Sequence, residues 1–364
     1  MKEKELKAND CSCPSCGAAM RYSPEKKKLY CENCQTCKDI EFNALQGKHS
    51  WEEKDELKKQ KEFALETKTL KCPNCGASVV LNKLEYSKGC PYCGSNLVSK
   101  NAENDNLTPD GILPFTFSDE VASQKYRQGI KKKWFVPNAF KKAPPTDNIR
   151  GIYIPSFGYD ADTFSTYRGK LATEHTGRDS NGHTYHYTTY QNISGNHNSN
   201  QVDVLVETST KIGQEEFEKI EPFYMDKAIE FKQGFIMGYT VEVFENSLEE
   251  CKKIADSIME SNVKDEILSK YSYDSVVYFN LDMTQTNKKY MYYLLPVYKC
   301  EYKYKNKSYT TFMNGQTGKV GGGYPKSPVK ITFFVLFWIL VLLGIIYLYF
   351  RFGGDDDLMF KIFN

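Results

Sequence analysis

Hydrophobic positions are densest near the C-terminus, over residues 331–350. None of these twenty residues is charged, and fifteen are Leu, Ile, Val or Phe. At roughly −0.3 to −0.6 kcal/mol each, those fifteen give an insertion free energy of about −4.5 to −9 kcal/mol. Twenty helical residues also match the ~30 Å hydrocarbon core of a bilayer. The pattern predicts a transmembrane helix over 331–350 rather than a buried core helix, followed by a short tail over 351–364.

Residues 113–325 combine helical and strand-like patterns. Ser118 is suited to cap a helix that Pro137 would end. Apolar residues recur at helical spacing after Asn246, which predicts a second helix. They are Leu248, Cys251, Ile254 and Ile258.

The remainder of this region is typical of strands. Residues 151–210 predict short strands broken by turns such as 180–182 and 194–196. Strands return over 276–309, and Asn314-Gly315 predicts a turn. We therefore expect one β-rich α+β domain over 113–325, with a possible internal division near residue 212.

The N-terminal hundred residues contain an internal repeat. A Cys-x-x-Cys pair is followed fourteen residues later by a second pair, and this arrangement occurs twice. Each unit is about thirty residues long, too short to bury a core of its own. The repeated cysteines are Cys13, Cys16, Cys31 and Cys34, then Cys72, Cys75, Cys90 and Cys93.

Four thiolates complete the tetrahedral shell of Zn²⁺, and structural zinc contributes about 10–16 kcal/mol in small peptides. The spacing thus predicts two zinc ribbons, over 8–48 and 68–98, with one structural Zn²⁺ each. Because every ligand position is filled, neither ion has an open position for catalysis. A four-thiolate iron site and redox thiol chemistry are the alternatives.

The first ribbon leaves its ligand choice open. Gln35 stands where the repeat predicts a glycine, Cys37 forms an overlapping pair with Cys34, and Cys11 lies just before Cys13. The repeated fourteen-residue gap favours the set given above.

Two further segments join these units. Residues 49–67 hold good helix formers with acidic residues before basic ones, which predicts a helical connector. Residues 99–112 predict a linker. Within the α+β region, the runs 131–134 and 141–142 are basic and lie near aromatic residues. They can contact phosphate of nucleic acid or lipid, although a charge run is more often a solvated helix face.

Net charge and the distribution of cysteines limit the classes of binding partner and the cellular compartment. A formal charge of +2 gives no general argument for nucleic acid. Ten of the twelve cysteines precede residue 94, and no secretory leader opens the chain. Clustered thiols of this kind indicate a reducing compartment and metal binding. The lysines just before the apolar run also favour an inside N-terminus. We expect a single-pass cell-membrane protein whose N-terminus is cytoplasmic.

No pattern indicates catalysis. His183 and His186 lie in a strand-like region and would point to opposite faces. The chain has neither His-Glu-x-x-His nor Gly-x-Ser-x-Gly. Residues 314–320 lack the Gly and Ser/Thr positions of a phosphate loop, so a hairpin turn is favoured there. We expect a protein that is not an enzyme and has no small-molecule substrate.

The arrangement resembles the YdjG-like bacterial zinc-ribbon membrane proteins, whose genes accompany a phage-shock-type envelope-stress system. The resemblance covers most of the chain in the right order. It rests on the paired ribbons and on residues 109–115, 133–138, 151–155 and 314–320.

Relatives of that family often carry labels such as TFIIB-type zinc ribbon-containing or primosomal-helicase-like, but no helicase motif is present here. The resemblance implies a membrane-anchored, zinc-binding adaptor that recruits cytosolic protein partners, such as a stress-system scaffold protein, to the lipid bilayer. The alternative hypothesis is a membrane-tethered nucleic-acid-binding ribbon protein.

Overall fold

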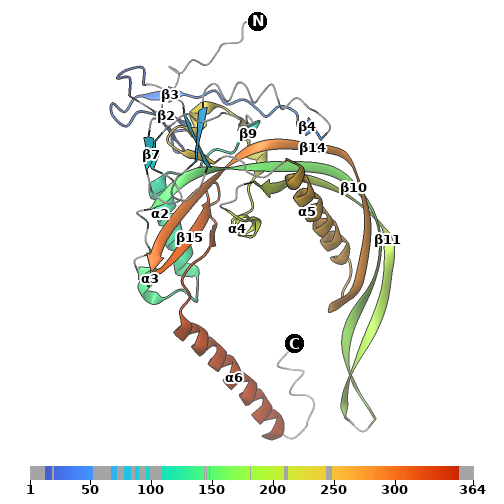
Figure 1. Ribbon diagram of the computed structural model, residues 1–364. Coiled ribbons are helices and arrows are strands. Elements are labelled where there is room, and N and C mark those ends of the chain that lie inside the picture. Colours follow the sequence, from blue (N-terminus) through green and yellow to red (C-terminus); the bar gives the residue numbers. More distant parts are fainter. Residues whose placement is uncertain are drawn as a thin grey trace.

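Two long strands organise the computed structural model of the chain (Figure 1). β10 spans Ile149–Arg178 and β14 spans Ser275–Tyr304, thirty residues each. They pair antiparallel from Ile149↔Cys300 to Ala172↔Ser275, with two register shifts. β11 (Thr184–Glu207) pairs antiparallel along the other edge of β10, from Ser156 to its end. At about 3.3 Å per residue, each long strand extends about 100 Å along its curve.

The structure describes residues 13–351, except 19, 52–66, 72–77, 83–86, 90–95, 99–108, 143, 145, 147, 181, 209–211 and 243–247. Most of the predicted connector 49–67 and of the predicted linker 99–112 lies outside the described residues. His49–Ser50 forms β4, which pairs with β14.

The turn predicted at residues 194–196 is wrong. β10 ends at Arg178 and β11 begins at Thr184, which leaves the turn near 180–182 in place. Residues 194–196, however, lie inside β11 and pair with 166–168 of β10. Gly195 serves close packing there, because a Cβ would lie 2.9 Å from Tyr167 Oη. The expected short strands are therefore two long ones.

Shorter strands extend the long pair into a sheet of eleven described strands. β13 runs parallel to the start of β10, β9 runs parallel to β14, and β15 pairs with the end of β14. The hairpin β5–β6, from the predicted second ribbon, joins the sheet through β13. The bounds are β5 Thr67–Lys71, β6 Ser78–Asn82, β9 Gly111–Ile112, β12 Ile229–Glu230, β13 Thr240–Glu242, β15 Lys307–Asn314 and β16 Val320–Gly322.

Helices α2 (Asp119–Lys132), α4 (Gln214–Glu218) and α5 (Leu248–Leu268) contact strands of the sheet, and α3 (Asn138–Lys142) contacts α2. Two short 3₁₀ turns, η2 (Met225–Lys227) and η3 (Gln233–Ile236), connect strands. α2 begins directly after Ser118, as predicted, but it ends at Lys132 rather than at Pro137. Pro137 instead precedes α3, where its carbonyl accepts a hydrogen bond from Lys141 N–H.

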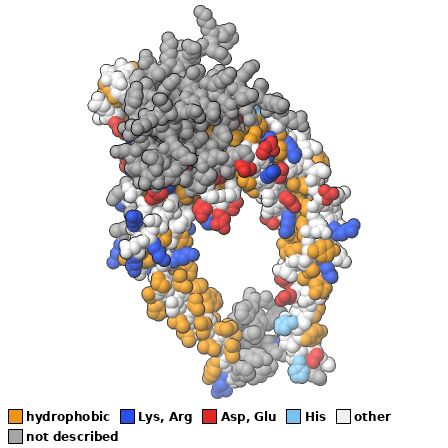
Figure 2. Space-filling view, viewed as in Figure 1, with side chains coloured by type: hydrophobic (Ala, Val, Ile, Leu, Met, Phe, Trp, Pro, Cys, Tyr) orange, Lys and Arg blue, Asp and Glu red, His pale blue; other side chains and the backbone are white. Residues whose placement is uncertain are grey.

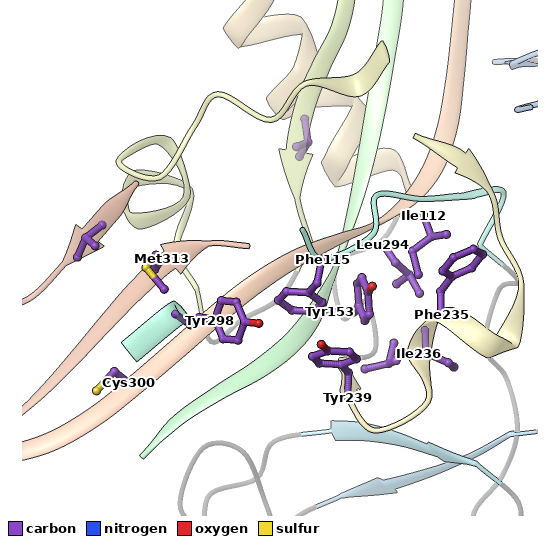
Figure 3. Close-up of a cluster of buried hydrophobic side chains, with 14 of the residues drawn as sticks. Ile112, Phe115, Tyr153, Phe235, Ile236, Tyr239, Leu294, Tyr298, Cys300 and Met313 are labelled. Carbon is purple, nitrogen blue, oxygen red and sulfur yellow. The ribbon is translucent and has the colours of Figure 1, made fainter. Parts of the chain in front are cut away.

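We call the part of the sheet where β9, β13 and β15 pair with β10 and β14 the body. Aromatic side chains fill its centre (Figure 3). The ring of Phe115 stacks on Tyr239 at 4.3 Å and lies 4.8 Å from Tyr298, whose hydroxyl donates to a backbone carbonyl at 2.6 Å. Gly151 makes room for this packing, because a Cβ would lie 2.6 Å from the Tyr239 ring. Aromatic pairs in such edge-to-face and offset arrangements contribute about 0.5–1.5 kcal/mol beyond their buried area.

The three strands β10, β11 and β14 continue beyond the body as an arm, defined here by residues 160–203 and 275–289. α5 begins at Leu248, close to its predicted start, and packs on the arm through buried residues repeated every four positions. These are Cys251, Ala255, Met259, Val263 and Ile267.

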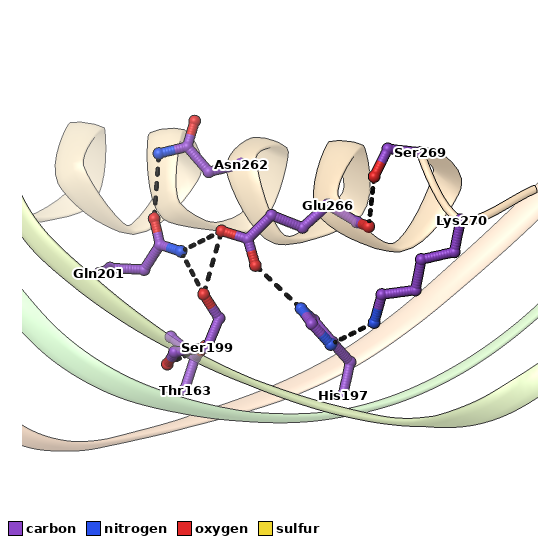
Figure 4. A network of polar contacts seen from close by, with 8 residues as sticks. All are labelled: Thr163, His197, Ser199, Gln201, Asn262, Glu266, Ser269 and Lys270. Carbon is purple, nitrogen blue, oxygen red and sulfur yellow. Dashed lines mark hydrogen bonds and ion pairs between the residues drawn. The ribbon is translucent and has the colours of Figure 1, made fainter.

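A polar network joins α5 to the arm (Figure 4). The Glu266 carboxylate accepts hydrogen bonds from Ser199 Oγ at 3.0 Å and Gln201 Nε2 at 2.9 Å. His197 Nε2 lies 2.9 Å from the same carboxylate, and its Nδ1 lies 2.8 Å from Lys270 Nζ. Burial alone raises the pKa of Glu266, but these contacts hold it below its usual value. The network thus fixes the angle between α5 and β11.

α6 (Pro328–Arg351) leaves the body at the end of the chain (Figure 1). It is the one helix among the described residues that is long and apolar enough to cross a membrane, over Pro328–Leu348, and none of that span is buried. A core helix of this composition would instead be largely covered by other elements of the chain.

We predict that Glu266→Ala lowers the unfolding free energy by about 1–3 kcal/mol, because it leaves hydrogen-bonding partners of the carboxylate unsatisfied. Thermal unfolding of the full chain in detergent measures this loss. Since the pKa of Glu266 is lowered, its contribution is complete at neutral pH and disappears as the pH falls through that lowered pKa.

Glu260→Ala is the matched control, because Glu260 is an exposed residue of the same helix. Equal loss of stability in the two variants would show that the network does not fix α5.

Candidate metal centre

A three-stranded antiparallel sheet positions the first cysteine group. Its strands are β1 (Arg21–Ser23), β2 (Lys28–Tyr30) and β3 (Cys37–Asp39). One Cys-x-x-Cys pair precedes β1 and the other connects β2 to β3. The hairpins therefore bring together two loops that are about fifteen residues apart in the chain.

The structure brings Cys13, Cys16, Cys31 and Cys34 together, with all four sulfurs within 4.8 Å of one another. The Sγ atoms of Cys13 and Cys34 are 3.4 Å apart, and those of Cys16 and Cys31 are 3.6 Å apart. A tetrahedral ion with ~2.3 Å metal–sulfur bonds places its sulfurs about 3.8 Å apart. The four thiols are free rather than disulfide-bonded. They can hold one metal ion.

The two Cys-x-x-Cys turns, called knuckles here, have the same backbone shape. Gly17 N–H donates to Cys13 O at 2.9 Å, and Gln35 N–H donates to Cys31 O at 2.9 Å. Gly17 has φ +73° and Gln35 has φ +64°. Gln35 therefore adopts the left-handed conformation that the repeat assigns to glycine, at a cost of about 1–2 kcal/mol for a residue with a Cβ.

Nearby hydrogen-bond donors favour the thiolate at two of the four cysteines, Cys13 and Cys34. At Cys31 a backbone N–H lowers the pKa, but burial and the adjacent thiols outweigh it and raise the pKa to about 11. Burial alone raises the pKa of Cys13, but N–H groups of Ser15 and Cys16, with the adjacent thiols, lower it to about 6. The hydroxyl of Thr36, 3.2 Å from Cys34 Sγ, and its backbone N–H lower the pKa of Cys34. Sequence reasoning missed Thr36, because only the folded turn places it against a sulfur. Four adjacent thiols cannot all ionise without a cation among them, since like charges disfavour the ionised form.

The competing ligands are placed differently. Cys37 starts β3, is exposed, and does not belong to the group of four. Cys11 lies outside the described residues. So do Cys72, Cys75, Cys90 and Cys93 of the predicted second ribbon. Of that ribbon the structure describes the hairpins β5–β6 and β7 (Ser87–Gly89) with β8 (Asn96–Val98).

The cysteine group is attached to the sheet body. Arg21 pairs with Glu32 of the ribbon at 2.9 Å and with Asp119 of α2 at 3.5 Å. Tyr22 N–H donates to Met237 O at 2.9 Å, and the Tyr22 ring lies 5.3 Å from a ring of η3. The three-stranded sheet that positions the cysteines is therefore docked on the body through β1.

The histidines lie apart from the cysteines. His183 lies in the turn after β10, and its backbone N–H donates a hydrogen bond to Asp179 Oδ1 at 2.8 Å. His186 lies on β11 and contacts Thr176. His49 contacts Asp110 at 2.8 Å.

Comparison with known proteins finds one distant relative. The chain is 27% identical over 323 residues, 88% of this chain and 91% of the relative, to the Bacillus subtilis (strain 168) protein named "Uncharacterized protein YdjG". This similarity is consistent with the YdjG-like resemblance, while the relative's name says nothing of zinc ribbons or membranes. No family model matches the chain. No solved structure matches it.

We predict that Gln35→Gly tightens metal binding about fivefold, because it removes about 1 kcal/mol of backbone strain. Gly17→Ala should weaken binding by a similar factor. No atom lies within 4 Å of the added Cβ, so its effect is conformational. Competition with a chelator measures both. Shifts in the same direction for the two variants would contradict the proposed symmetry of the knuckles.

Proposed function

We propose that this protein is a membrane-anchored, zinc-binding adaptor that recruits a cytosolic protein partner to the cell membrane in a bacterial envelope-stress system. One observation carries the proposal. The same chain has an arm whose outer strand, β11, has an unpaired edge among the described strands, and an exposed apolar helix, α6, at its C-terminal end. The following features support it.

The metal would be structural. Four thiolates suit Zn²⁺ in number, ligand softness and geometry, and they leave no position for a substrate. We extend the same assignment to the second cysteine repeat because its spacing is identical. Zinc there would link the β5–β6 hairpin, which pairs with β13, to the β7–β8 hairpin.

The tether would be α6, with the ribbons in the cytosol. Metal-binding thiolates need a reducing compartment. The lysines Lys319, Lys326 and Lys330 precede the apolar helix, which also favours a cytoplasmic N-terminus.

The arm supplies a surface for a partner. Among the described strands, β11 pairs only with β10, so its outer edge is open along most of its length. Beyond Ala172, where pairing with β14 ends, β10 and β11 continue as a two-stranded ribbon. Isolated two-stranded ribbons are marginally stable in water. Open edges also accept added strands from other chains.

The distal ribbon also presents aromatic side chains. Tyr185, Tyr187 and Tyr190 of β11 are all exposed. Tyrosines combine a large apolar surface with a hydrogen-bonding hydroxyl, and they are enriched at binding hot spots. Because hydrocarbon cannot solvate open strand edges, the arm would remain in water beside the membrane that α6 enters.

We predict two zinc ions per purified full-length chain by elemental analysis. Cys13→Ser and Cys72→Ser should each remove one ion, because three remaining thiolates cannot complete the tetrahedral shell. Cys37→Ser is the control and should leave the metal content unchanged. Loss of an ion from the control, or iron in place of zinc, would contradict the assignment.

Crosslinking in membranes followed by purification of the full chain tests recruitment. We predict that the triple variant Tyr185→Ser, Tyr187→Ser and Tyr190→Ser reduces the recovered protein partner at least about tenfold, as loss of a hot spot would. Tyr224→Ser is the matched control, since Tyr224 is equally exposed on the body. Recovery of mainly nucleic acid, with steep salt dependence, would favour the alternative; unchanged partner recovery would exclude the arm.

A further inference from the structure

The first turns of α6 are held by a segment almost two hundred residues earlier in the chain. Ser327 N–H donates to Phe135 O at 2.7 Å. Lys330 Nζ donates to Val136 O at 2.8 Å and to Asn138 Oδ1 at 2.7 Å. The rings of Phe135 and Phe334 meet edge to face at 5.4 Å. The loop between α2 and α3 is therefore fixed beside the point where the apolar helix begins.

This contact surrounds the start of α6 with basic side chains. Figure 2 shows Lys and Arg gathered where the hydrophobic helix joins the body. We call this surface the collar. It consists of Lys131, Lys132, Lys133, Trp134, Lys141, Lys142 and Lys326.

The collar has an unbalanced positive charge. Residues 131–142 and 326–330 contain no Asp or Glu. None of the ion pairs between described residues involves a collar lysine. Desolvation and the neighbouring charge of Lys330 lower the pKa of Lys141. An anion beside the collar would relieve this repulsion.

Trp134 projects from the middle of the collar. Its side chain is 69% exposed, whereas Val136 and Phe140 on the same segment are buried. An exposed tryptophan costs solvation free energy in water but is favoured at the boundary between lipid head groups and hydrocarbon. Its place beside the first apolar turn of α6 matches that boundary.

We propose that the collar binds anionic lipid head groups of the leaflet that α6 enters, with Trp134 at the head-group level. The inference rests on α6 crossing the membrane, as in the proposed function. A lipid bilayer accounts for the lysines, for Trp134 and for the exposed apolar helix beside them. A free phosphate accounts for the lysines alone, and a nucleic acid, which can stack on a tryptophan, leaves the apolar helix unexplained. The collar also lies directly beside the first turn of α6. If α6 enters a bilayer, the surface of that bilayer must therefore lie against these lysines.

The test uses the full chain in lipid nanodiscs, with Trp51→Phe and Trp338→Phe so that Trp134 is the only tryptophan, and with excitation that selects tryptophan over tyrosine. Brominated phosphatidylglycerol and brominated phosphatidylcholine are compared as quenchers at equal mole fraction. We expect about fivefold stronger quenching by phosphatidylglycerol, the effect of about 1 kcal/mol for one lysine near a charged surface. High salt should reduce this preference.

The variant Lys131→Gln, Lys132→Gln and Lys142→Gln should abolish the preference, while quenching by phosphatidylcholine persists. Lys253→Gln, Lys264→Gln and Lys289→Gln form the matched control, because these exposed lysines lie on α5 and the arm. Equal quenching by the two lipids in the unsubstituted background, or equal loss in the control, would overturn the proposal. Reversal by inorganic phosphate at constant ionic strength would assign the lysines to free phosphate.

Carbonate extraction of the membranes tests the membrane span separately from the lipid binding of the collar. Release of the full chain would exclude the membrane span and the collar together. Retention of the chain without lipid preference would overturn the collar alone.

Discussion

The antiparallel pairing of β10 with β14 is the constraint on which the other parts depend. It runs without a break in direction from Ile149↔Cys300 in the body to Ala172↔Ser275 in the arm. Within the body, the short strands β9, β13 and β15 pair with these two strands and thereby enclose the aromatic core. Towards the other end, the same two strands carry β11 outwards and give α5 a surface to pack against (Figure 1). The body and the proposed partner surface are thus parts of one sheet.

The cysteine group depends on a different source of stability. Its small core contains Cys13, Met20, Leu29 and Cys31, too few side chains to fold a ribbon alone. A metal ion at the four sulfurs would supply the missing free energy. Docking through Arg21 and Tyr22 then orients the ribbon on the body. The two parts also differ in how closely they are packed. The sheet leaves no room for a Cβ at Gly151, whereas the turn after Cys34 accepts Gln35 in a left-handed conformation.

Features set by local sequence were predictable. Helical spacing after Asn246 gave α5, and Asn314, whose side chain accepts hydrogen bonds from two following N–H groups, gave the turn before β16. Cysteine spacing indicated the four residues that the structure brings together. Features set by distant partners were not predictable. The glycine at 195 resembles a turn signal until β10 lies beside it, and nothing in the sequence shows that the loop after α2 contacts α6.

Hydrogen exchange on the full-length chain in nanodiscs tests the central claim, that one continuous strand pair supports both the body and the arm. Backbone amides of residues 149–172 and 275–300 that bond between the strands should exchange slowly and as one cooperative unit. Amides in the two-stranded ribbon of residues 173–189 should exchange much faster. If the body and the arm exchanged as independent blocks, with fast exchange around residues 160–166, the account would be contradicted.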